Sequence, residues 1–262
     1  MDLNELTSLA HKAKLKLLEM HHGAKVGHIG GNLSCLDILL TLHHRTLKEA
    51  QPFILSKGHA AGAMYITLWS LGVLTDDDLA TFHTDGTLLA GHPPAGFGRG
   101  IVFPTGSLGH GFSLANGMAL GAKLNGSGER VFCLTSDGEW QEGSTWEALV
   151  FAIRHNLNLT VIIDGNNLQG FGRTSDVAGM GDLANRIRGF GVDVREIDGH
   201  NFYEIEAACE SPEFGVGIIY AHTVKGRGVS FMQDKMEWHY LPLNDELYLK
   251  AVAEINHGRE QL

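Results

Sequence analysis

The fold of this chain is decided by residues 131–167, which read VFCLTSDGEWQEGSTWEALVFAIRHNLNLTVIIDGNN. Two short apolar runs, residues 131–136 and 159–163, predict strands, and residues 142–156 between them predict a helix. A strand, a helix and a second strand in this order form a βαβ unit, which favours a parallel sheet with right-handed crossovers. We therefore predict an α/β fold with a doubly wound, mostly parallel sheet flanked by helices.

The rest of the chain adds helices and strands to this unit. Helical spacing of apolar residues predicts further helices, one of them capped by Ser34. These helices cover residues 3–19, 34–42, 58–71, 112–124 and 202–210. Two more strands are predicted at 192–197 and 216–220, and a loop rich in glycine and proline at 85–103. Because no linker or repeat interrupts the chain, residues 1–262 are expected to form one domain.

Composition and charge exclude several classes of protein. The 44% of hydrophobic residues can form a full core, but a net charge of −10 leaves no broad basic surface for nucleic acid or anionic lipid. No apolar run reaches the length of a membrane span, and the N-terminal segment lacks the apolar core of a signal peptide. Cys35, Cys133 and Cys209 are expected to be buried thiols in a reducing cytoplasm. Nucleic acid and membrane are therefore not expected partners.

Polar residues that can hold a metal follow the two strands of the βαβ unit. Asp137 and Gly138 end the first strand and Asn166 follows the second, so their side chains should meet at one edge of the sheet. A carboxylate, an amide oxygen and nearby carbonyls suit Mg²⁺ that shares its coordination with a diphosphate, and Gly138 would let the backbone approach the phosphates. From spacing alone, Asp137-Gly138 and Asp164-Gly165 could equally be turns that end strands.

These residues also belong to a known pattern. Ser-Asp-Gly, followed after three residues by Glu-Gly and later by Asp-Gly-Asn-Asn, resembles the thiamine diphosphate fingerprint of transketolases. Further blocks resemble transketolase motifs in the family's order: Gly27-His28-Ile29-Gly30-Gly31, Ser56-Lys57-Gly58-His59-Ala60, Gly91-His92-Pro93, Gly106-Ser107-Leu108-Gly109 and Trp140-Gln141-Glu142-Gly143. The resemblance covers roughly residues 10–240 and is specific to the N-terminal, diphosphate-binding domain of the family.

The resemblance implies a cofactor-binding role for many of the matching residues. Asp137, Asn166 and the carbonyl of Leu168 would bind Mg²⁺. The residues that would contact thiamine diphosphate itself are Gly138, Asn166, His59 and His239 at the diphosphate, and Gly106, Ser107 and Leu108 at the aminopyrimidine. Imidazoles donate hydrogen bonds to phosphate oxygens, and a nearby polyanion raises their pKa and so strengthens the contact.

The resemblance also implies roles on the substrate side and at an interface. His28 and His92 match histidines that reach the sugar near the reactive carbon, where they would hydrogen-bond to its oxygens and exchange protons with them. His239 is expected to be a catalytic residue as well as a diphosphate contact. Glu142 either favours the start of its helix or, as the resemblance implies, joins a carboxylate network across a subunit interface. No role is expected for Glu139, which stands where the motif tolerates variation.

Other histidines are not expected to act. The pairs His21-His22 and His43-His44 are predicted to be solvated helix surface. His110 and His222 stand where glutamine and lysine are common in the family, which leaves the identity of the substrate open.

A second domain of the family is needed for catalysis. The cofactor's own amino group makes its reactive carbanion after a buried glutamate of a pyrimidine-binding domain has shifted the ring to the imino form. Only residues 240–262 follow His239, too few for that domain. The resemblance therefore implies the N-terminal, diphosphate-binding subunit of a split transketolase, which pairs with a C-terminal partner subunit in an α₂β₂ heterotetramer.

The expected reaction is the transfer of a two-carbon ketol unit from a ketose, or its phosphate, to an aldose, or its phosphate. The implied cofactors are thiamine diphosphate and Mg²⁺. One alternative is a subunit of another two-component thiamine diphosphate enzyme, such as one for unusual sugars or a decarboxylating synthase. The other alternative is a non-catalytic cofactor-binding homologue.

Overall fold

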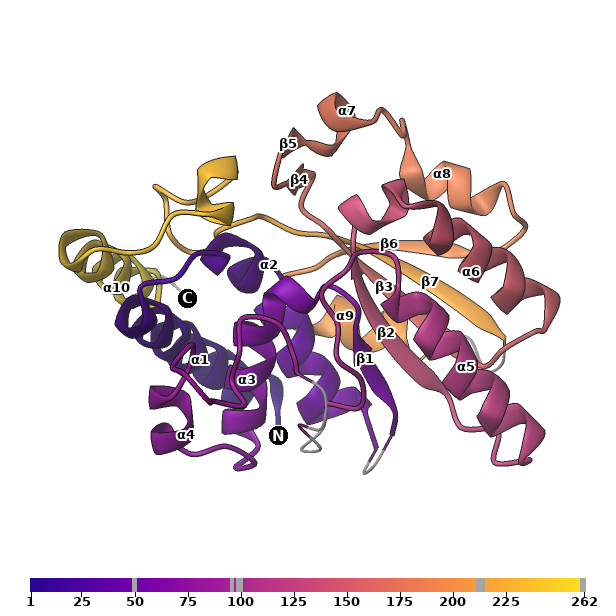
Figure 1. The fold of residues 1–262 in the computed structure, drawn as a ribbon, viewed down its shortest axis with the longest axis horizontal. Helices are drawn as coiled ribbons and strands as arrows, with labels where there is room; N and C mark the ends of the chain where they lie inside the picture. The colour runs from indigo at the N-terminus through magenta and orange to yellow at the C-terminus, as the bar shows by residue number, and fades with distance from the viewer. Residues whose placement is uncertain (49–50, 95–96, 98–100, 211–214, 260–262) are drawn as a thin grey trace.

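The computed structural model describes residues 1–48, 51–94, 97, 101–210 and 215–259. At their centre is a sheet of five parallel strands in the order β1-β2-β3-β7-β6 (Figure 1). The strands are β1 (Phe53–Leu55), β2 (Val131–Ser136), β3 (Leu159–Gly165), β6 (Val194–Asp198) and β7 (Val216–His222). The predicted α/β fold with a parallel sheet is confirmed.

Helices cover both faces of the sheet (Figure 1). Side chains alternate along β2, so that Val131 and Cys133 enter one apolar core and Phe132 and Leu134 enter the other. The helices of the first core are α5 (Gly111–Leu124), α6 (Gly143–Arg154) and α8 (Leu183–Arg188). Those of the second core are α1 (Leu3–Ala24), α2 (Ile29–Thr41), α3 (Ala61–Ser70), α9 (Phe202–Cys209) and α10 (Asp245–Arg259). Because both faces are buried, the central strands are continuous apolar runs.

Short elements connect the main ones, and several of them follow strand ends. They are η1 (Leu42–Thr46), η2 (Gly58–Ala60), α4 (Asp76–Ala80), η3 (Gly138–Gln141), β4 (Leu168–Gln169), β5 (Gly172–Arg173), α7 (Thr174–Val177) and η4 (Met236–His239). β4 and β5 pair as a small antiparallel hairpin just after β3. Within the described ranges, no helix combines the length and the apolar character that crossing a membrane requires.

The predicted strands are all present, and their ends differ from prediction by no more than two residues. β1 escapes prediction, because three residues are too few to show a period. The predicted helices are present too, although the first continues to Ala24 and the one predicted at 34–42 starts elsewhere. Part of the loop predicted at 85–103 lies outside the described residues, which omit 95–96 and 98–100.

The predicted helix start at Ser34 is wrong. α2 begins at Ile29 and passes through Gly30 and Gly31. An added Cβ on Gly30 would lie 3.1 Å from Cγ of Lys225, so glycine serves close packing here. The Ser34 hydroxyl lies inside the helix and donates to the Asp164 carboxylate at 2.6 Å.

The prediction of a solvated surface for two histidine pairs is also wrong. His21 is 1% exposed, and its ring packs against Phe82 at a centroid distance of 5.2 Å. His22, His43 and His44 are half-buried. His22 stacks on Tyr248 of α10, His43 of η1 packs against Phe53 of β1, and His44 of η1 bonds to Ser70 of α3. These contacts with distant elements are not revealed by any local period.

A buried carboxylate joins three elements on this side of the sheet. Asp37 of α2 is 2% exposed; its carboxylate pairs with Lys14 of α1 at 3.0 Å and with Nδ1 of His200, after β6, at 2.9 Å. The other ring nitrogen of His200 accepts the N–H of Val224 at 3.0 Å. Burial by itself would raise the pKa of Asp37, but Lys14 and His200 outweigh it and lower the pKa to about 2.

We expect Asp37→Asn to lower the free energy of unfolding at pH 7 by about 2 kcal/mol, because a carboxylate with a depressed pKa stabilises the folded state wherever it is ionised. The variant's loss of unfolding free energy should be largest above the unfolded-state pKa of about 4 and should shrink as the pH falls toward 2. Urea unfolding at several pH values measures it. Asp193→Asn, at an exposed aspartate, is the control and should change stability by less than about 0.5 kcal/mol. If the difference in unfolding free energy between wild type and Asp37→Asn does not change down to pH 3, the prediction is contradicted.

Candidate active site

A cavity of about 210 Å³ opens at the carboxyl edge of the sheet. Its lining comes from segments far apart in the sequence, which parallel strands bring to one edge. The predicted site residues that line it are His28, His59, His92, Gly106, Leu108, Asp137, Gly138, Asn166, Leu168 and His239. Ser107 and Glu142 are exposed and do not line it. The fold therefore gathers most of the residues that the sequence singled out.

The four predicted histidines of this cavity stand together. The ring of His28 lies 4.9 Å from that of His239, 5.8 Å from that of His92 and 5.9 Å from that of His59, measured between centroids. His28 has a left-handed backbone with φ of 65°, and its N–H donates to the His239 carbonyl at 3.0 Å. Such a conformation costs energy in a residue other than glycine, so packing and this hydrogen bond must hold it in place.

These imidazoles are neutral near pH 7. Burial, with Lys225 and a neighbouring histidine adding to it, lowers the pKa of His28 to about 4 and that of His239 to about 3. Burial likewise lowers the pKa of His59 well below its ordinary value and lowers the pKa of His92. A neutral imidazole offers one donor and one acceptor, and a bound anion would stabilise its charged form and raise these pKa values.

The oxygen ligands predicted for a metal meet at this cavity. Asp137 directly follows β2, and its carboxylate accepts the N–H of Gly138 at 2.8 Å and also that of Asn167. Asn166 follows β3, and its side-chain oxygen accepts the N–H of Leu168 at 3.0 Å. Burial and the charge of Asp164 raise the pKa of Asp137 to about 7. A cation beside Asp137 would offset both effects, so the donor set fits a hard divalent ion.

In the described part of the chain, no group of three or more His, Cys, Asp or Glu side chains is arranged to hold a metal ion. A metal at this cavity would therefore rely on one carboxylate and neutral oxygens, which is a set that Mg²⁺ completes with substrate or cofactor phosphate oxygens.

The structure adds a cation that the sequence reasoning missed. Lys225 lines the cavity and is 2% exposed. Its Nζ lies 3.3 Å from the Leu168 carbonyl and 3.2 Å from Nδ1 of His239. Burial and the charge of Lys57 lower its pKa to about 8. The available signal was its place three residues after His222, a position that the sequence analysis noted without considering Lys225.

Comparison with known proteins places this arrangement in a family. Residues 8–257 match the family described as "Transketolase, thiamine diphosphate binding domain". The chain belongs to the transketolase family.

Relatives of this transketolase-family chain include whole subunits as well as longer enzymes. An apulose-4-phosphate transketolase subunit of Phocaeicola vulgatus is 34% identical over 100% of this chain and 98% of that protein. The 6-deoxy-6-sulfo-D-fructose transketolase subunit SqwG of a Clostridium species is 37% identical over 88% of each chain. The crystal structure of transketolase from Campylobacter jejuni is 28% identical with a TM-score of 0.88, covering 98% of this chain and 43% of that one. The chain thus spans less than half of that longer transketolase.

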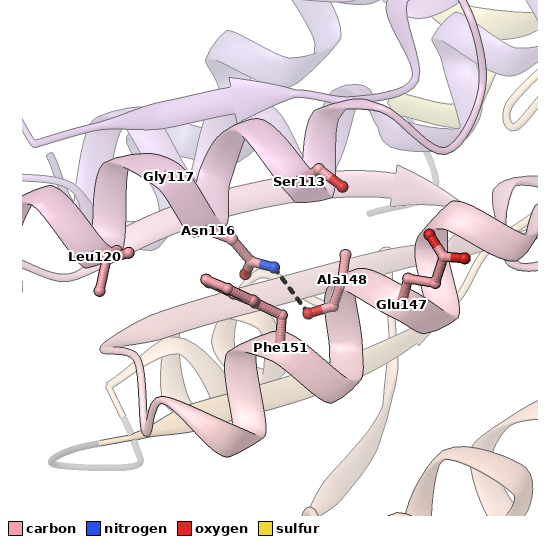
Figure 2. A pocket seen from close by; sticks show the side chains of 7 residues that line it. All are labelled: Ser113, Asn116, Gly117, Leu120, Glu147, Ala148 and Phe151. Carbon is pink, nitrogen blue, oxygen red and sulfur yellow. Dashed lines mark hydrogen bonds between the residues drawn. The ribbon is translucent and has the colours of Figure 1, made fainter.

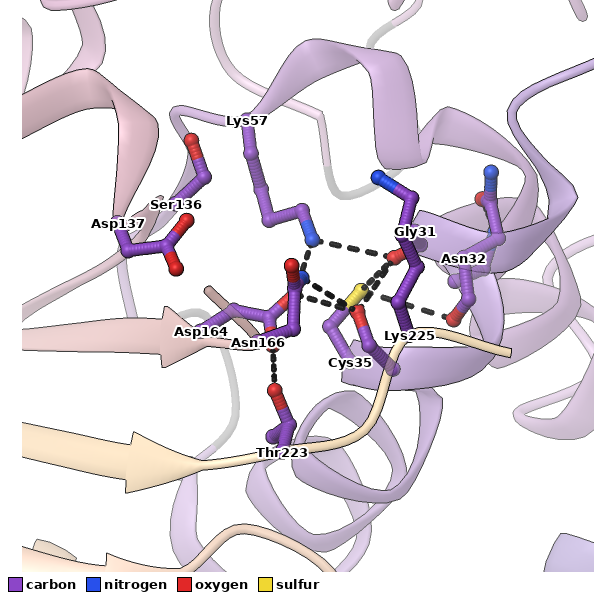
Figure 3. Close-up of polar contacts among 12 residues, drawn as sticks. Gly31, Asn32, Cys35, Lys57, Ser136, Asp137, Asp164, Asn166, Thr223 and Lys225 are labelled. Atoms are coloured by element: carbon purple, nitrogen blue, oxygen red, sulfur yellow. Dashed lines mark hydrogen bonds and ion pairs between the residues drawn. The ribbon is translucent and has the colours of Figure 1, made fainter. Parts of the chain in front are cut away.

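Beneath the cavity of this transketolase domain lies a buried ion pair that the sequence reasoning also missed. Lys57 and Asp164, both 0% exposed, form a close pair, and the Lys57 ammonium also donates to the Gly31 carbonyl at 3.1 Å (Figure 3). Burial by itself would lower the pKa of Lys57 and raise that of Asp164, but their mutual attraction outweighs it in both. The two residues lie in the motifs Ser-Lys-Gly-His and Asp-Gly-Asn-Asn, but nothing in the sequence pairs them.

This ion pair orients a proposed metal ligand. The Asp164 carboxylate accepts from Thr223, from Lys57 and from Nδ2 of Asn166, the last at 3.3 Å (Figure 3). It also accepts the Ser34 hydroxyl. With its nitrogen turned toward Asp164, the Asn166 amide must direct its oxygen away from that carboxylate. By accepting from Nδ2 of Asn166, Asp164 thereby keeps the side-chain oxygen of Asn166 available as a ligand.

Glycines leave room at the lining of this transketolase cavity. An added Cβ on Gly138 would lie 3.5 Å from Gln169, and one on Gly31 would lie 3.7 Å from the His59 ring. Either side chain would occupy space at the lining, so the chain offers a backbone cradle that a diphosphate could approach.

The two departures from the family pattern do not line the cavity. His110 is exposed just before α5, and His222 is exposed and bonds to Glu196 at 3.0 Å. Glu142 caps α6 without a side-chain capping hydrogen bond. These three residues therefore lie outside the cavity lining.

Proposed function

We propose that residues 1–262 act as one diphosphate-binding domain and form the N-terminal subunit of a two-subunit transketolase. With its partner it would transfer a two-carbon ketol unit from a ketose, or its phosphate, to an aldose, or its phosphate. The observation that carries the proposal is the meeting of His28, His59, His92 and His239 with Asp137 at one cavity, in a chain whose full-length relatives are named as transketolase subunits.

Thiamine diphosphate and Mg²⁺ are the proposed cofactors. Mg²⁺ would be held by the proposed ligands Asp137, Asn166 and the carbonyl of Leu168. The diphosphate would lie against the donors Gly138, Asn166, His59, His239 and Lys225, and the aminopyrimidine against the loop of Gly106, Ser107 and Leu108. When bound, thiamine diphosphate supplies a carbanion that adds to a carbonyl and then stores an electron pair.

His28 and His92 are proposed to bind the sugar. Both line the cavity, and their lowered pKa values keep them neutral, so each offers one N–H and one lone pair. These groups can hold a sugar hydroxyl and move a proton to or from a sugar oxygen. The fixed backbone of His28 would keep its ring in place while this happens.

The proposed assembly is an α₂β₂ heterotetramer with a pyrimidine-binding partner subunit. A groove of about 320 Å³ runs between α5 and α6 and includes Glu147 and Phe151 (Figure 2). Phe151 in the groove is 39% exposed, and Leu124 of α5 and Val150 of α6 are 79% and 49% exposed, which leaves apolar surface on these two helices. We propose that two copies of this chain pack here and that Glu142, exposed at the start of α6, meets the second copy.

Cytoplasmic location is part of the proposal. Cys35, Cys133 and Cys209 are buried free thiols, as predicted. Such thiols persist in a reducing compartment, which supports the cytoplasm as the place where the enzyme works.

Ketol transfer by the assembled enzyme tests the proposed function. The chain would be produced together with candidate partner subunits and assayed over a panel of ketoses and aldoses, with and without phosphate. Transfer with at least one sugar pair is expected. Tight binding of thiamine diphosphate and Mg²⁺ without any transfer would favour the non-catalytic cofactor-binding homologue, and transfer of another carbon unit would favour another two-component enzyme.

Substitution of the four histidines should separate cofactor binding from turnover. We expect His59→Ala or His239→Ala to weaken thiamine diphosphate binding by about 10- to 100-fold, because each removes a hydrogen bond to a charged group. His28→Ala or His92→Ala should instead lower kcat by about 100-fold, with cofactor affinity close to wild type. Calorimetric titration and steady-state kinetics of the assembled variants measure both. Equal loss of cofactor in all four variants would show that this division of roles is wrong.

A further inference from the structure

Glu139 follows the cofactor-facing Gly138, yet its side chain is 0% exposed and does not line the cavity. Its Oε1 accepts the Ser56 hydroxyl and the N–H of Gly109, the latter at 3.1 Å. Its Oε2 accepts the N–H of Ser136 at 2.9 Å. One buried carboxylate thus joins three separate chain segments.

All three segments contribute to the cavity lining, and Ser136 is itself a lining residue. Ser56 lies three residues before His59, and Gly109 directly follows Leu108. The segments also touch each other, since an added Cβ on Gly58 would lie 2.6 Å from the carbonyl carbon of Thr105. Glu139 therefore holds two contacting backbones against the end of β2, next to Asp137.

The segment around Gly109 is fixed from a second side. Gly109 has a positive φ of 79°, and its carbonyl accepts the Ser144 hydroxyl at 2.9 Å. An added Cβ would lie 2.5 Å from that hydroxyl oxygen, so the backbone has no room to shift toward α6. If the bond from the Gly109 N–H to Glu139 were lost, the bond from the Ser144 hydroxyl to the Gly109 carbonyl would remain.

We propose that Glu139 is a positioning residue: its carboxylate ties the Ser56–His59 and Gly106–Gly109 segments to the metal-bearing end of β2 and so sets their spacing around thiamine diphosphate. This inference rests on the proposed function, because the ligand of these segments is the proposed cofactor. It assigns a role to a residue for which the sequence indicated none.

The chemistry of the three donors requires a carboxylate. A carboxylate accepts at both oxygens, whereas a glutamine of the same shape accepts at one and donates at the other. If the glutamine oxygen faced Ser56 and Gly109, its NH₂ group would meet the N–H of Ser136. In the reverse orientation the Ser56 hydroxyl can turn to accept from the NH₂ group, but the N–H of Gly109 loses its acceptor. Glu139→Gln is therefore a conservative change that should release at least one segment.

Two measurements test this role. Hydrogen–deuterium exchange of the purified chain follows the amides of residues 105–112, and calorimetric titration with thiamine diphosphate and Mg²⁺ follows cofactor binding by the assembled enzyme. Glu139→Gln should speed exchange in this segment by about tenfold and weaken cofactor binding by about tenfold, because local opening now competes with the bound geometry.

Thr160→Val is the matched control. It removes the part-buried hydrogen bond that Nη1 of Arg130 donates to the Thr160 hydroxyl at 2.8 Å, near the opposite end of β3. It should lower the melting temperature to a similar degree, yet leave exchange in 105–112 and cofactor affinity at wild-type values. Ser56→Ala combined with Glu139→Gln should cost little more cofactor affinity than Glu139→Gln alone, since both break the same link.

The outcomes separate this inference from the proposed function. Wild-type exchange and wild-type cofactor affinity in Glu139→Gln would overturn the positioning role while leaving the proposed function intact. If the wild-type enzyme does not bind thiamine diphosphate, the proposed function and the cofactor part of the inference fail together. Faster exchange with unchanged affinity would also overturn the role, because the spacing that Glu139 sets would then not matter to the cofactor.

Discussion

Replacing Asp137 by alanine is expected to weaken Mg²⁺-dependent binding of thiamine diphosphate more than about 100-fold, since even outer-shell partners of metal ligands contribute 10- to 100-fold. Asp137 is the only charged ligand among those proposed for the metal. Its carboxylate lies at the cavity lining and carries a pKa raised to about 7 by burial and Asp164, which a divalent ion would reverse.

The variant should still fold. Removal of one of two neighbouring buried carboxylates relieves repulsion, which offsets the loss of the bonds from Gly138 and Asn167. Calorimetric titration of the assembled enzyme with Mg²⁺ and thiamine diphosphate measures the effect, with circular dichroism as a check on folding. Asp193→Ala, at an exposed aspartate, serves as the control. Cofactor affinity near wild type in a folded Asp137→Ala enzyme would remove Asp137 from the metal site.

The second large effect concerns the partner: the purified 262-residue chain is expected to show no ketol transfer with thiamine diphosphate, Mg²⁺ and any sugar pair. In the described part of the chain, Asp137 is the one carboxylate that lines the cavity, and the proposal commits it to the metal. Among these described lining residues, no carboxylate is then left to hydrogen-bond the cofactor's pyrimidine ring. In the family, the glutamate that hydrogen-bonds the pyrimidine ring belongs to the pyrimidine-binding domain.

The rim of the cavity supports a covering partner. Phe171 and Tyr240 line the cavity and are 83% and 56% exposed, and the neighbouring Leu241 is 47% exposed. Apolar and aromatic side chains exposed beside a cavity mark an interaction surface. Adding the partner should therefore restore both transfer and tight cofactor binding, and light scattering should give the mass of two copies of each subunit. Robust turnover by the chain alone, verified by mass spectrometry, would show that a base exists within it.

Much of the fold could be predicted from local sequence. The apolar runs that became β2 and β3 are long enough to show burial on both faces, and the segment between them has helical length. β1 was missed because its three residues show no period, and the start of α2 was missed because Gly30 and Gly31 serve packing against another segment. Local patterns report local burial, and these features depend on distant neighbours.

The sequence by itself determined the parallel α/β fold and the transketolase family, because these depend on residue type and order along the chain. For the same reason it was enough to propose the four cavity histidines, Asp137 and Asn166 as site residues. Only the tertiary structure decided which side chains pair. Lys57 meets Asp164 across 107 positions, and Glu139 joins Ser56, 83 positions away. Parallel strands bring remote segments to one edge of the sheet. A buried charge there pairs with a polar group of whichever segment lies next to it in the fold. That is why Glu139, which has no assigned place in the motif, became the residue that ties the cavity segments together.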